Sequence, residues 1–263
     1  MTSTLHPLSG ISIEERSWLQ GFIAEEPILS LYFDTALEDL ANGIDNRLVL
    51  IGRQRRGFIL GIAFDAVDVF SLFGHLEVDE MRTLASHPRR AEICVQPALV
   101  ETVRSLCAAR IEGVFEMRVY TRTTEQVASE DARCRRLTAA DLQEASAFYA
   151  AHYPQTVFSG WMLDLPFLAI FGGGRIIAAA GVLAIGRRSR RAIIGNFLTD
   201  PMHRGRGLAK AVGRSLISAL RAEGIDQVAL VTTGENTAAA RAYEALGFCL
   251  AERWVQLDLK PVN

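Results

Sequence analysis

The stretch "TDPMHRGRGLAKAV", residues 199–212, decides the fold because it joins two segments of different periodicity. Before it, residues 192–199 form an apolar run typical of a buried strand. After it, residues 208–222 carry apolar side chains at helical spacing, which predicts an amphipathic helix. The stretch between them is a turn rich in glycine and arginine. The first N–H groups of a helix lack partners inside the helix and lie at the positive end of its dipole, so this turn indicates an anion site.

Two common phosphate-binding motifs do not fit this turn. A P-loop needs G-x-x-x-x-G-K-[ST], which the chain lacks. A dinucleotide fingerprint needs a third glycine, but Gly205 and Gly207 are followed by Leu208, Ala209 and Lys210. A pyrophosphate held by glycine N–H groups and the two arginines remains open. So does a plain helix start with two flexible glycines.

A second motif follows the next apolar run, residues 227–232. Asn236 is a good N-cap for a helix, and Gly247 fits its C-terminal end. Capping explains both ends of this segment, but it does not explain Tyr243 between them. Two spaced motifs in this order are more informative than the glycine turn alone.

Arg204-x-x-Gly207-x-Ala209 resembles the acyl-CoA signature Q/R-x-x-G-x-G/A of the GNAT acyltransferase superfamily. Residues 236–248 are similar to that family's second signature, N-x-x-A-x-x-L-Y-E-K-L-G-F. The resemblance covers about residues 133 to 260. It implies an α/β fold whose mixed central sheet is splayed between its fourth and fifth strands, with acyl-CoA in the gap. On this chain those strands are residues 192–199 and 227–232.

The resemblance also implies roles for single residues. Backbone groups of Phe197, Leu198 and Thr199 hold the pantetheine arm, and an N–H near Leu198 serves as oxyanion donor. Asn236 and Ala239 lie on the pantetheine side, and Tyr243 is the general acid, since a phenol stays protonated at neutral pH. The expected pyrophosphate cradle is Arg204, Gly205, Arg206, Gly207, Leu208 and Ala209.

No general base is assigned. The predicted fourth strand holds no acid before Asp200, which fits a capping role in the proline turn, and Asn196 cannot accept a proton at neutral pH. Glu235 and His152 are weaker candidates, and a water chain is another. Five aromatic residues could line the acceptor pocket or simply fill the core: Phe148, Tyr149, Tyr153, Phe158 and Trp161. The basic run at residues 186–191 fits a solvated hairpin tip.

The chain echoes itself across a polar segment, residues 123–133. The segment from Leu48 matches that from Leu168 as a strand hairpin, and the segment from Leu99 matches that from Leu208 as helix, Glu-Gly and strand. The latter match leaves the first half without the glycine turn. We expect two tandem GNAT-like domains, a degenerate one at residues 1–125 and a catalytic one at residues 133–263, similar to the glycine N-acyltransferase-like group.

The composition of the chain limits the classes of partner and the compartment that we expect for it. The net charge of -2 does not favour nucleic acid, and neither a membrane span nor a signal-peptide pattern is present. The four scattered cysteines form no zinc pattern or disulfide framework, so a cytoplasmic protein without metal is expected. A homodimer is left open.

The leading functional hypothesis is an N-acyltransferase that moves an acyl group, first of all acetyl, from acyl-CoA to a primary amine of a small molecule or amino acid. A non-catalytic acyl-CoA-binding regulator is the second hypothesis. Thioester hydrolysis and acetylation of a protein lysine or N-terminus form the third.

Overall fold

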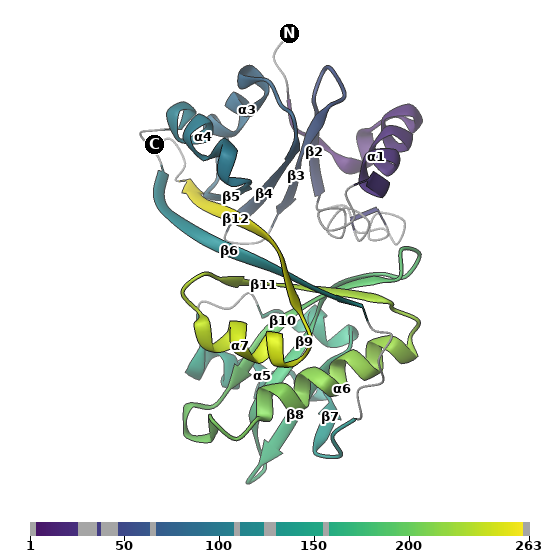
Figure 1. Ribbon diagram of the computed structural model, residues 1–263, viewed down its shortest axis with the longest axis vertical. Coiled ribbons are helices and arrows are strands. Elements are labelled where there is room, and N and C mark those ends of the chain that lie inside the picture. Colours follow the sequence, from purple (N-terminus) through teal and green to yellow (C-terminus); the bar gives the residue numbers. More distant parts are fainter. Residues whose placement is uncertain are drawn as a thin grey trace. The chain divides into compact units, whose positions relative to one another are not determined.

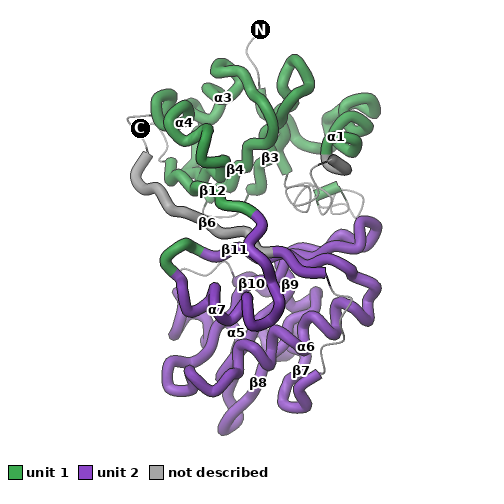
Figure 2. The backbone as a smooth tube through the Cα atoms, in the orientation of Figure 1, with its two compact units in different colours: residues 1–119, 233–235, 252–263 green, residues 120–232, 236–251 purple. Residues whose placement is uncertain are grey.

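The computed structural model describes residues 4–25, 36–37, 47–63, 67–107, 111–123, 130–154 and 158–259. The chain forms two compact units, which are coloured separately in Figure 2. Unit 1 comprises Met1–Val119, Thr233–Glu235 and Glu252–Asn263, and unit 2 comprises Tyr120–Thr232 and Asn236–Ala251. Most of the expected linker, residues 124–129, lies outside the described residues.

Unit 1 is built on a mixed sheet with the strand order β1-β2-β3-β4-β5-β12-β6 (Figure 1). The strands β2 to β4 are antiparallel, β4 and β5 are parallel, and β12 is antiparallel to β5. Its strands are β1 (His6–Pro7), β2 (Arg47–Ile51), β3 (Gly57–Ala63), β4 (Asp68–Gly74), β5 (Ala91–Val95), β6 (Ile111–Thr123) and β12 (Cys249–Leu259). Its helices are α1 (Ile13–Glu25), α3 (Val78–Ala85) and α4 (Val100–Leu106).

Unit 2 has the strand order β7-β8-β9-β10-β11, in which β7 to β10 are antiparallel and β10 and β11 are parallel. Its strands are β7 (Cys134–Arg136), β8 (Phe167–Gly172), β9 (Arg175–Gly186), β10 (Arg191–Thr199) and β11 (Gln227–Thr233). Its helices are α5 (Leu142–His152), α6 (Leu208–Ala222) and α7 (Thr237–Ala245). The predicted helix at residues 208–222 is confirmed at both ends, and the two predicted strands agree with β10 and β11 to within one residue.

The two halves of the chain repeat the same order of elements. In the first half the order is β2-β3-β4-α3-β5-α4-β6, and in the second it is β8-β9-β10-α6-β11-α7-β12. In each half three antiparallel strands come first and a helix then leads to a parallel strand. Two parallel strands need a crossover connection, and in each half the helix supplies it.

This order corrects one of the two predicted matches. The hairpins from Leu48 and Leu168 do correspond, as β2–β3 and β8–β9. The helix from Leu99, however, lies after the parallel strand β5 and so corresponds to α7, while the counterpart of α6 is α3. The prediction failed because a short amphipathic helix followed by a strand occurs twice in each half. The expected C-cap glycine of that helix, Gly113, lies inside β6, whereas Gly224 does follow α6.

The last strand of the chain completes the sheet of unit 1. Residues 255–259 of β12 pair with residues 91–95 of β5 in antiparallel register. The predicted second domain, residues 133–263, would contain this strand, but Glu252–Asn263 cluster with unit 1. Cutting the chain in the linker would therefore take one strand away from the sheet of unit 1.

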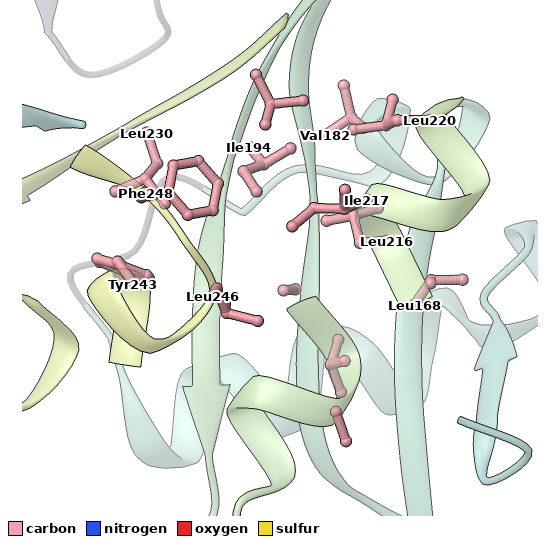
Figure 3. Close-up of a cluster of buried hydrophobic side chains, with 14 of the residues drawn as sticks. Leu168, Val182, Ile194, Leu216, Ile217, Leu220, Leu230, Tyr243, Leu246 and Phe248 are labelled. Atoms are coloured by element: carbon pink, nitrogen blue, oxygen red, sulfur yellow. The ribbon is translucent and has the colours of Figure 1, made fainter. Parts of the chain in front are cut away.

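The sheet of unit 2 is covered on both faces because its strands alternate apolar side chains between them. The first face packs against α6 and α7 through a cluster that includes Leu168, Ile194, Leu216, Tyr243 and Phe248 (Figure 3). The opposite face packs against α5 and a 3-10 helix at Gly160–Asp164 through a second cluster. That second cluster includes Phe167, Ala169, Tyr149, Met162 and Leu198.

Candidate active site

The parallel strands β10 and β11 pair only at their first residues. Arg191, Ala192 and Ile193 are opposite Gln227, Val228 and Ala229. Beyond Ile193 the two strands continue, to Thr199 and Thr233, without further pairing between them among the described residues. Buried backbone N–H and C=O groups need partners, so the unpaired edge of β10 can accept an extended chain from outside.

A β-bulge interrupts β10 where this edge opens. Gly195 pairs with Gly181 and Leu198 with Ala179, so three steps along β10 oppose two along β9. Asn196 lies in the extra segment with a φ of 52°, a left-handed conformation in which asparagine is enriched among non-glycine residues.

The bulge changes which face each side chain occupies. Ile194 packs into the cluster beneath α6 and α7, and regular alternation would send Leu198 there as well. Instead Phe197 packs against that cluster, and Leu198 lies in the cluster beneath α5. The extra residue therefore places Phe197 on the α7 side of the sheet. Three residues expected to hold pantetheine, Phe197, Leu198 and Thr199, follow directly after the bulge.

Side chains from the opposite face hold the bulge in place. The Tyr149 hydroxyl of α5 donates a hydrogen bond to the Asn196 carbonyl oxygen at 2.6 Å. The Asn196 side-chain amide lies 3.4 Å from the Met162 sulfur, which accepts its N–H. Both contacts come from buried residues, so the core beneath α5 supplies the Asn196 carbonyl with a hydrogen-bond donor.

The turn after β10 is ordered by Asp200 and by backbone carbonyls. Asp200 accepts a hydrogen bond from the Met202 N–H at 2.9 Å and contacts His203 Nδ1 at 2.9 Å. The hydrogen bond from the Met202 N–H is the main reason that the pKa of Asp200 is lowered. The predicted capping role of Asp200 in the proline turn is thus confirmed. The guanidinium groups of Arg204 and Arg206 donate to the Thr199 and Met202 carbonyl oxygens at 3.3 and 3.4 Å.

The turn ends in a helix start that suits an anion. Gly205 and Gly207 have φ values of 75° and 72°, which favour glycine, and a Cβ on either would enter open space. The first helical hydrogen bond of α6 runs from the Ala211 N–H to the Gly207 carbonyl oxygen. No acidic residue occupies the first turn of α6, and no side chain caps it. The positive end of this helix is therefore not neutralised by the chain itself.

Helix α7 is capped at both ends as the sequence predicted. The Asn236 side chain accepts a hydrogen bond from the Ala239 N–H at 3.1 Å. At the other end the Gly247 N–H donates to the Glu244 carbonyl oxygen and the Phe248 N–H to that of Tyr243, with a φ of 85° at Gly247. These two bonds form a Schellman motif, which turns the chain back toward the sheet.

The caps fix the position of Tyr243. Its ring is 7% exposed and makes an edge contact with Phe197, with ring centroids 5.2 Å apart, and a second with Phe248 at 6.3 Å. The structure thus brings Tyr243 of α7 to Phe197 of β10 (Figure 3 labels Tyr243 and Phe248). Gly213 of α6 makes room for this packing, since a Cβ there would lie 3.1 Å from the Phe197 ring. No pattern in the sequence pointed to this role of Gly213.

The contacts of the candidate bases do not single out one of them. Asp200 is used as a cap, and His152, at the end of α5, interacts electrostatically with it. Glu235 is exposed in the turn before α7. The Asn196 side chain contacts Met162. The base therefore stays unassigned.

The five aromatic residues that could line the acceptor pocket, the predicted aromatic wall, divide into two groups. Phe148 and Tyr149 are buried, and Phe158 stacks on Tyr149 with ring centroids 4.8 Å apart, so these three rings belong to the core beneath α5. Only Tyr153 and Trp161 are exposed, by 45% and 49%. For these three rings the structure favours the core alternative over the pocket lining. The basic run does form the β9–β10 turn, with Arg187 and Arg190 paired to Glu223 and Asp226.

The corresponding turn of unit 1 is built differently. Helix α3 begins with a capping box in which Glu77 and Glu80 accept each other's backbone N–H groups, and Asp79 adds a third acid. The buried Glu80 carboxylate also accepts the Arg53 N–H at 2.7 Å. Strands β4 and β5 pair over four residues, Asp68 to Ser71 with Ala91 to Cys94. Carboxylates therefore satisfy the helix start, and the strand pair is closed along most of β5.

Two further features, a group of metal ligands and a membrane-spanning helix, are absent from the described residues. Within the ranges that the structure describes, no three His, Cys, Asp or Glu side chains are grouped as metal ligands would be. No described helix has both the length and the apolar character needed to cross a bilayer.

Comparisons with known proteins agree with this geometry. Residues 124–248 match the model of the acetyltransferase (GNAT) family. A mycothiol acetyltransferase of Thermobispora bispora is 47% identical over 55 residues, which cover 21% of this chain and 18% of that relative. The match thus spans less than a fifth of the curated relative.

Solved structures extend the likeness of fold. A Drosophila protein superimposes with a TM-score of 0.74 at 13% identity, covering 97% of this chain and 98% of that one. A GNAT-family protein of Novosphingobium aromaticivorans (TM-score 0.60, 21% identity) covers 78% of this chain and 89% of its own. A GCN5-related N-acetyltransferase of Sphaerobacter thermophilus (TM-score 0.58, 12% identity) covers 83% and 82%. The match to the GNAT family model covers residues 124–248, just under half of the chain, and the solved structures share the fold of the chain.

Proposed function

We propose that unit 2 is an acyl-CoA-dependent N-acyltransferase that acylates a primary amine of a small molecule or amino acid. The observation that carries the proposal is the end of β10–β11 pairing after Ile193, which leaves unpaired with β11 the part of β10 where Phe197 meets Tyr243. Acyl-CoA supplies an activated acyl thioester. Acetyl is the first acyl group to test, since a relative of part of this chain is named an acetyltransferase.

The residues of unit 2 fit acyl-CoA at three places. The unpaired edge of β10 at Phe197 to Thr199 offers backbone groups to the pantetheine amides, as a further strand would. The turn from Arg204 to Ala209 offers N–H groups and two arginines to the pyrophosphate. Asn236 and Ala239 begin the helix that faces this edge through Tyr243.

Acyl transfer needs an oxyanion donor and a proton for the leaving thiolate. In the proposed reaction the amine nitrogen bonds to the acyl carbon and the C–S bond breaks. A backbone N–H near Leu198, just after the bulge, stabilises the carbonyl oxygen as it gains charge. The Tyr243 hydroxyl gives its proton to the thiolate, and the proton released by the amine passes to a base that is not assigned.

The acceptor is proposed to lie near Tyr153 and Trp161. These two rings are the exposed members of the predicted wall, and Trp161 precedes Met162, which contacts the bulge. Aromatic rings at an exposed position suit a small substrate with an apolar part.

Calorimetry with acetyl-CoA tests the proposal. We expect Gly207→Glu to weaken binding about tenfold or more, because it adds a negative charge and a strained side chain where the phosphates bind. The matched control is Gly174→Glu in the β8–β9 turn. Gly174 also has a positive φ and open space around it, so that variant carries the same strain and charge away from the site. Equal affinities in the two variants would contradict the proposed phosphate site, and no binding by the unmodified protein would contradict the function.

We also infer that the chain is a tandem of two related halves in which only the second binds acyl-CoA. The repeated order of elements supports the relationship. The acidic capping box of α3 and the closed β4–β5 pair support the loss of the site in unit 1. The same titration gives the stoichiometry: one acyl-CoA per chain is expected, and two would contradict the inference.

A further inference from the structure

Tyr149 is a buried polar residue of unit 2 that the proposed reaction does not use. It lies on α5 and is 2% exposed. Its ring stacks on Phe158 and makes edge contacts with Phe167 and Phe148. Three aromatic contacts fix the ring, so its hydroxyl can reach only a small region of the sheet.

The partner of that hydroxyl is the backbone carbonyl of Asn196, the residue in the bulge. Tyr149 donates to the Asn196 oxygen at 2.6 Å, a short distance for an O–H···O bond. Asn196 is the residue with the left-handed φ of 52°. This bond ties a part-buried residue of the bulge to a ring that the core holds in place.

We infer that Tyr149 is a positioning residue for acyl transfer: it clamps the Asn196 carbonyl and so sets the direction of the N–H groups that follow the bulge. The peptide that carries the Asn196 oxygen also carries the Phe197 N–H. A planar peptide rotates as one body, so fixing the oxygen fixes that N–H and the start of the next peptide. The inference rests on the proposed function, in which a backbone donor near Leu198 serves the acyl carbonyl.

Tyr149 acts through the backbone and does not exchange protons with substrate. Burial raises the pKa of its phenol well above the ordinary value, so the hydroxyl remains a donor throughout the neutral range. It lies in the cluster beneath α5, whereas Tyr243 lies in the cluster beneath α6 and α7. The two tyrosines therefore have separate tasks on opposite faces of one sheet.

The test is Tyr149→Phe, which keeps the three ring contacts and removes only the hydroxyl. A catalytic donor that is misaligned by a fraction of an ångström loses much of its effect, so kcat should fall about tenfold. The KM for acetyl-CoA and its calorimetric affinity should change clearly less than kcat, because the turn that binds the phosphates is untouched and only the Phe197 end of the pantetheine edge is disturbed. A purely structural role would not produce this split between kcat and KM.

The matched control is Ser189→Ala. The Ser189 hydroxyl donates to the Gly186 carbonyl oxygen at 3.2 Å at the far end of the β9–β10 hairpin, so this variant also loses one hydroxyl-to-carbonyl bond. Its kcat should equal that of the unmodified protein.

A second measurement does not depend on turnover. Amide hydrogen exchange at Phe197 and Leu198 should accelerate in Tyr149→Phe and not in Ser189→Ala. Unchanged exchange together with unchanged kcat in Tyr149→Phe would overturn the inference. A loss of acetyl-CoA affinity as large as the loss of kcat in this variant would also overturn it, since the clamp would then act on binding. If the unmodified protein neither binds nor turns over acetyl-CoA, the proposed function falls, and the catalytic part of this inference with it.

Discussion

Gly213→Ala tests the packing that places Phe197 beside Tyr243. Gly213 lies in the middle of α6, where a Cβ would come 2.6 Å from Leu246 Cδ1 and 3.1 Å from Phe197 Cε1. The first of these distances is shorter than real Cβ contacts, so Leu246 must shift and Phe197 must yield. Overpacking a core costs about 1–3 kcal/mol, whereas alanine in place of glycine inside a helix gains about 1 kcal/mol. The net expectation is a loss of about 1 kcal/mol.

The control for the helical gain is Gly21→Ala. Gly21 lies inside α1, and a Cβ there meets nothing within 4 Å, so only the gain of about 1 kcal/mol remains. Gly213→Ala should lower the thermal unfolding midpoint of unit 2 by about 2–4 °C, measured by circular dichroism. Gly21→Ala should raise the midpoint of unit 1. The turnover of Gly213→Ala should also fall, because the displaced Phe197 ring carries Tyr243 with it. A midpoint and a turnover equal to those of the unmodified protein would refute this account of the packing.

Three further predictions concern single side chains of unit 2. Tyr243→Phe should lower kcat about tenfold or more while the affinity for acetyl-CoA stays within about twofold, measured by steady-state kinetics and calorimetry; an unchanged kcat would exclude Tyr243 as the general acid. Asn236→Ala should destabilise the protein by about 1 kcal/mol because the Ala239 N–H loses its cap, while Asn236→Asp keeps it; equal unfolding midpoints for the two variants would contradict the capping role. Hydrogen bonds from the Arg135 side chain, and then from Thr138, lower the pKa of Asp141 to about 2. The stabilising effect of Asp141 is therefore fully present above the ordinary aspartate pKa of about 3.9 and is lost as the pH falls through about 2. We expect Asp141→Asn to lower the unfolding midpoint at pH 7 and to leave it unchanged below a pH of about 2.

The sequence was most informative where local chemistry determines local structure. The ends of α6 follow from the glycine turn and the apolar period, and those of α7 follow from Asn236 and Gly247. The residues that form a helix cap, and the glycines that adopt a positive φ beside it, lie within a few residues of one another. A short stretch of sequence is therefore enough to predict them. The two family motifs coincide with these helix starts, which is why the motif and the capping interpretation both hold for residues 236–248.

The features that sequence reasoning missed depend on contacts between distant elements. The bulge at Asn196 is a matter of register between β9 and β10, and its clamp joins residues 149 and 196. A two-residue period cannot show that one residue is extra, so alternation alone would place Leu198 beneath α6. An asparagine in an apolar strand after Gly195 was the signal that could have indicated a left-handed residue there.

The two halves of the chain differ at the helix start for which we propose an anion site in unit 2. In unit 2 the helix start after the third antiparallel strand is left without acids, and the adjacent strand pair opens after three residues. In unit 1 the equivalent helix start carries Glu77, Asp79 and Glu80, and Glu80 also holds the β2–β3 turn through Arg53. An acidic capping box stabilises a helix start with the chain's own carboxylates, and those carboxylates repel a phosphate from the same N–H groups. Because this stability would be lost with its acids, replacing them in unit 1 is expected to unfold α3 before it restores a phosphate site.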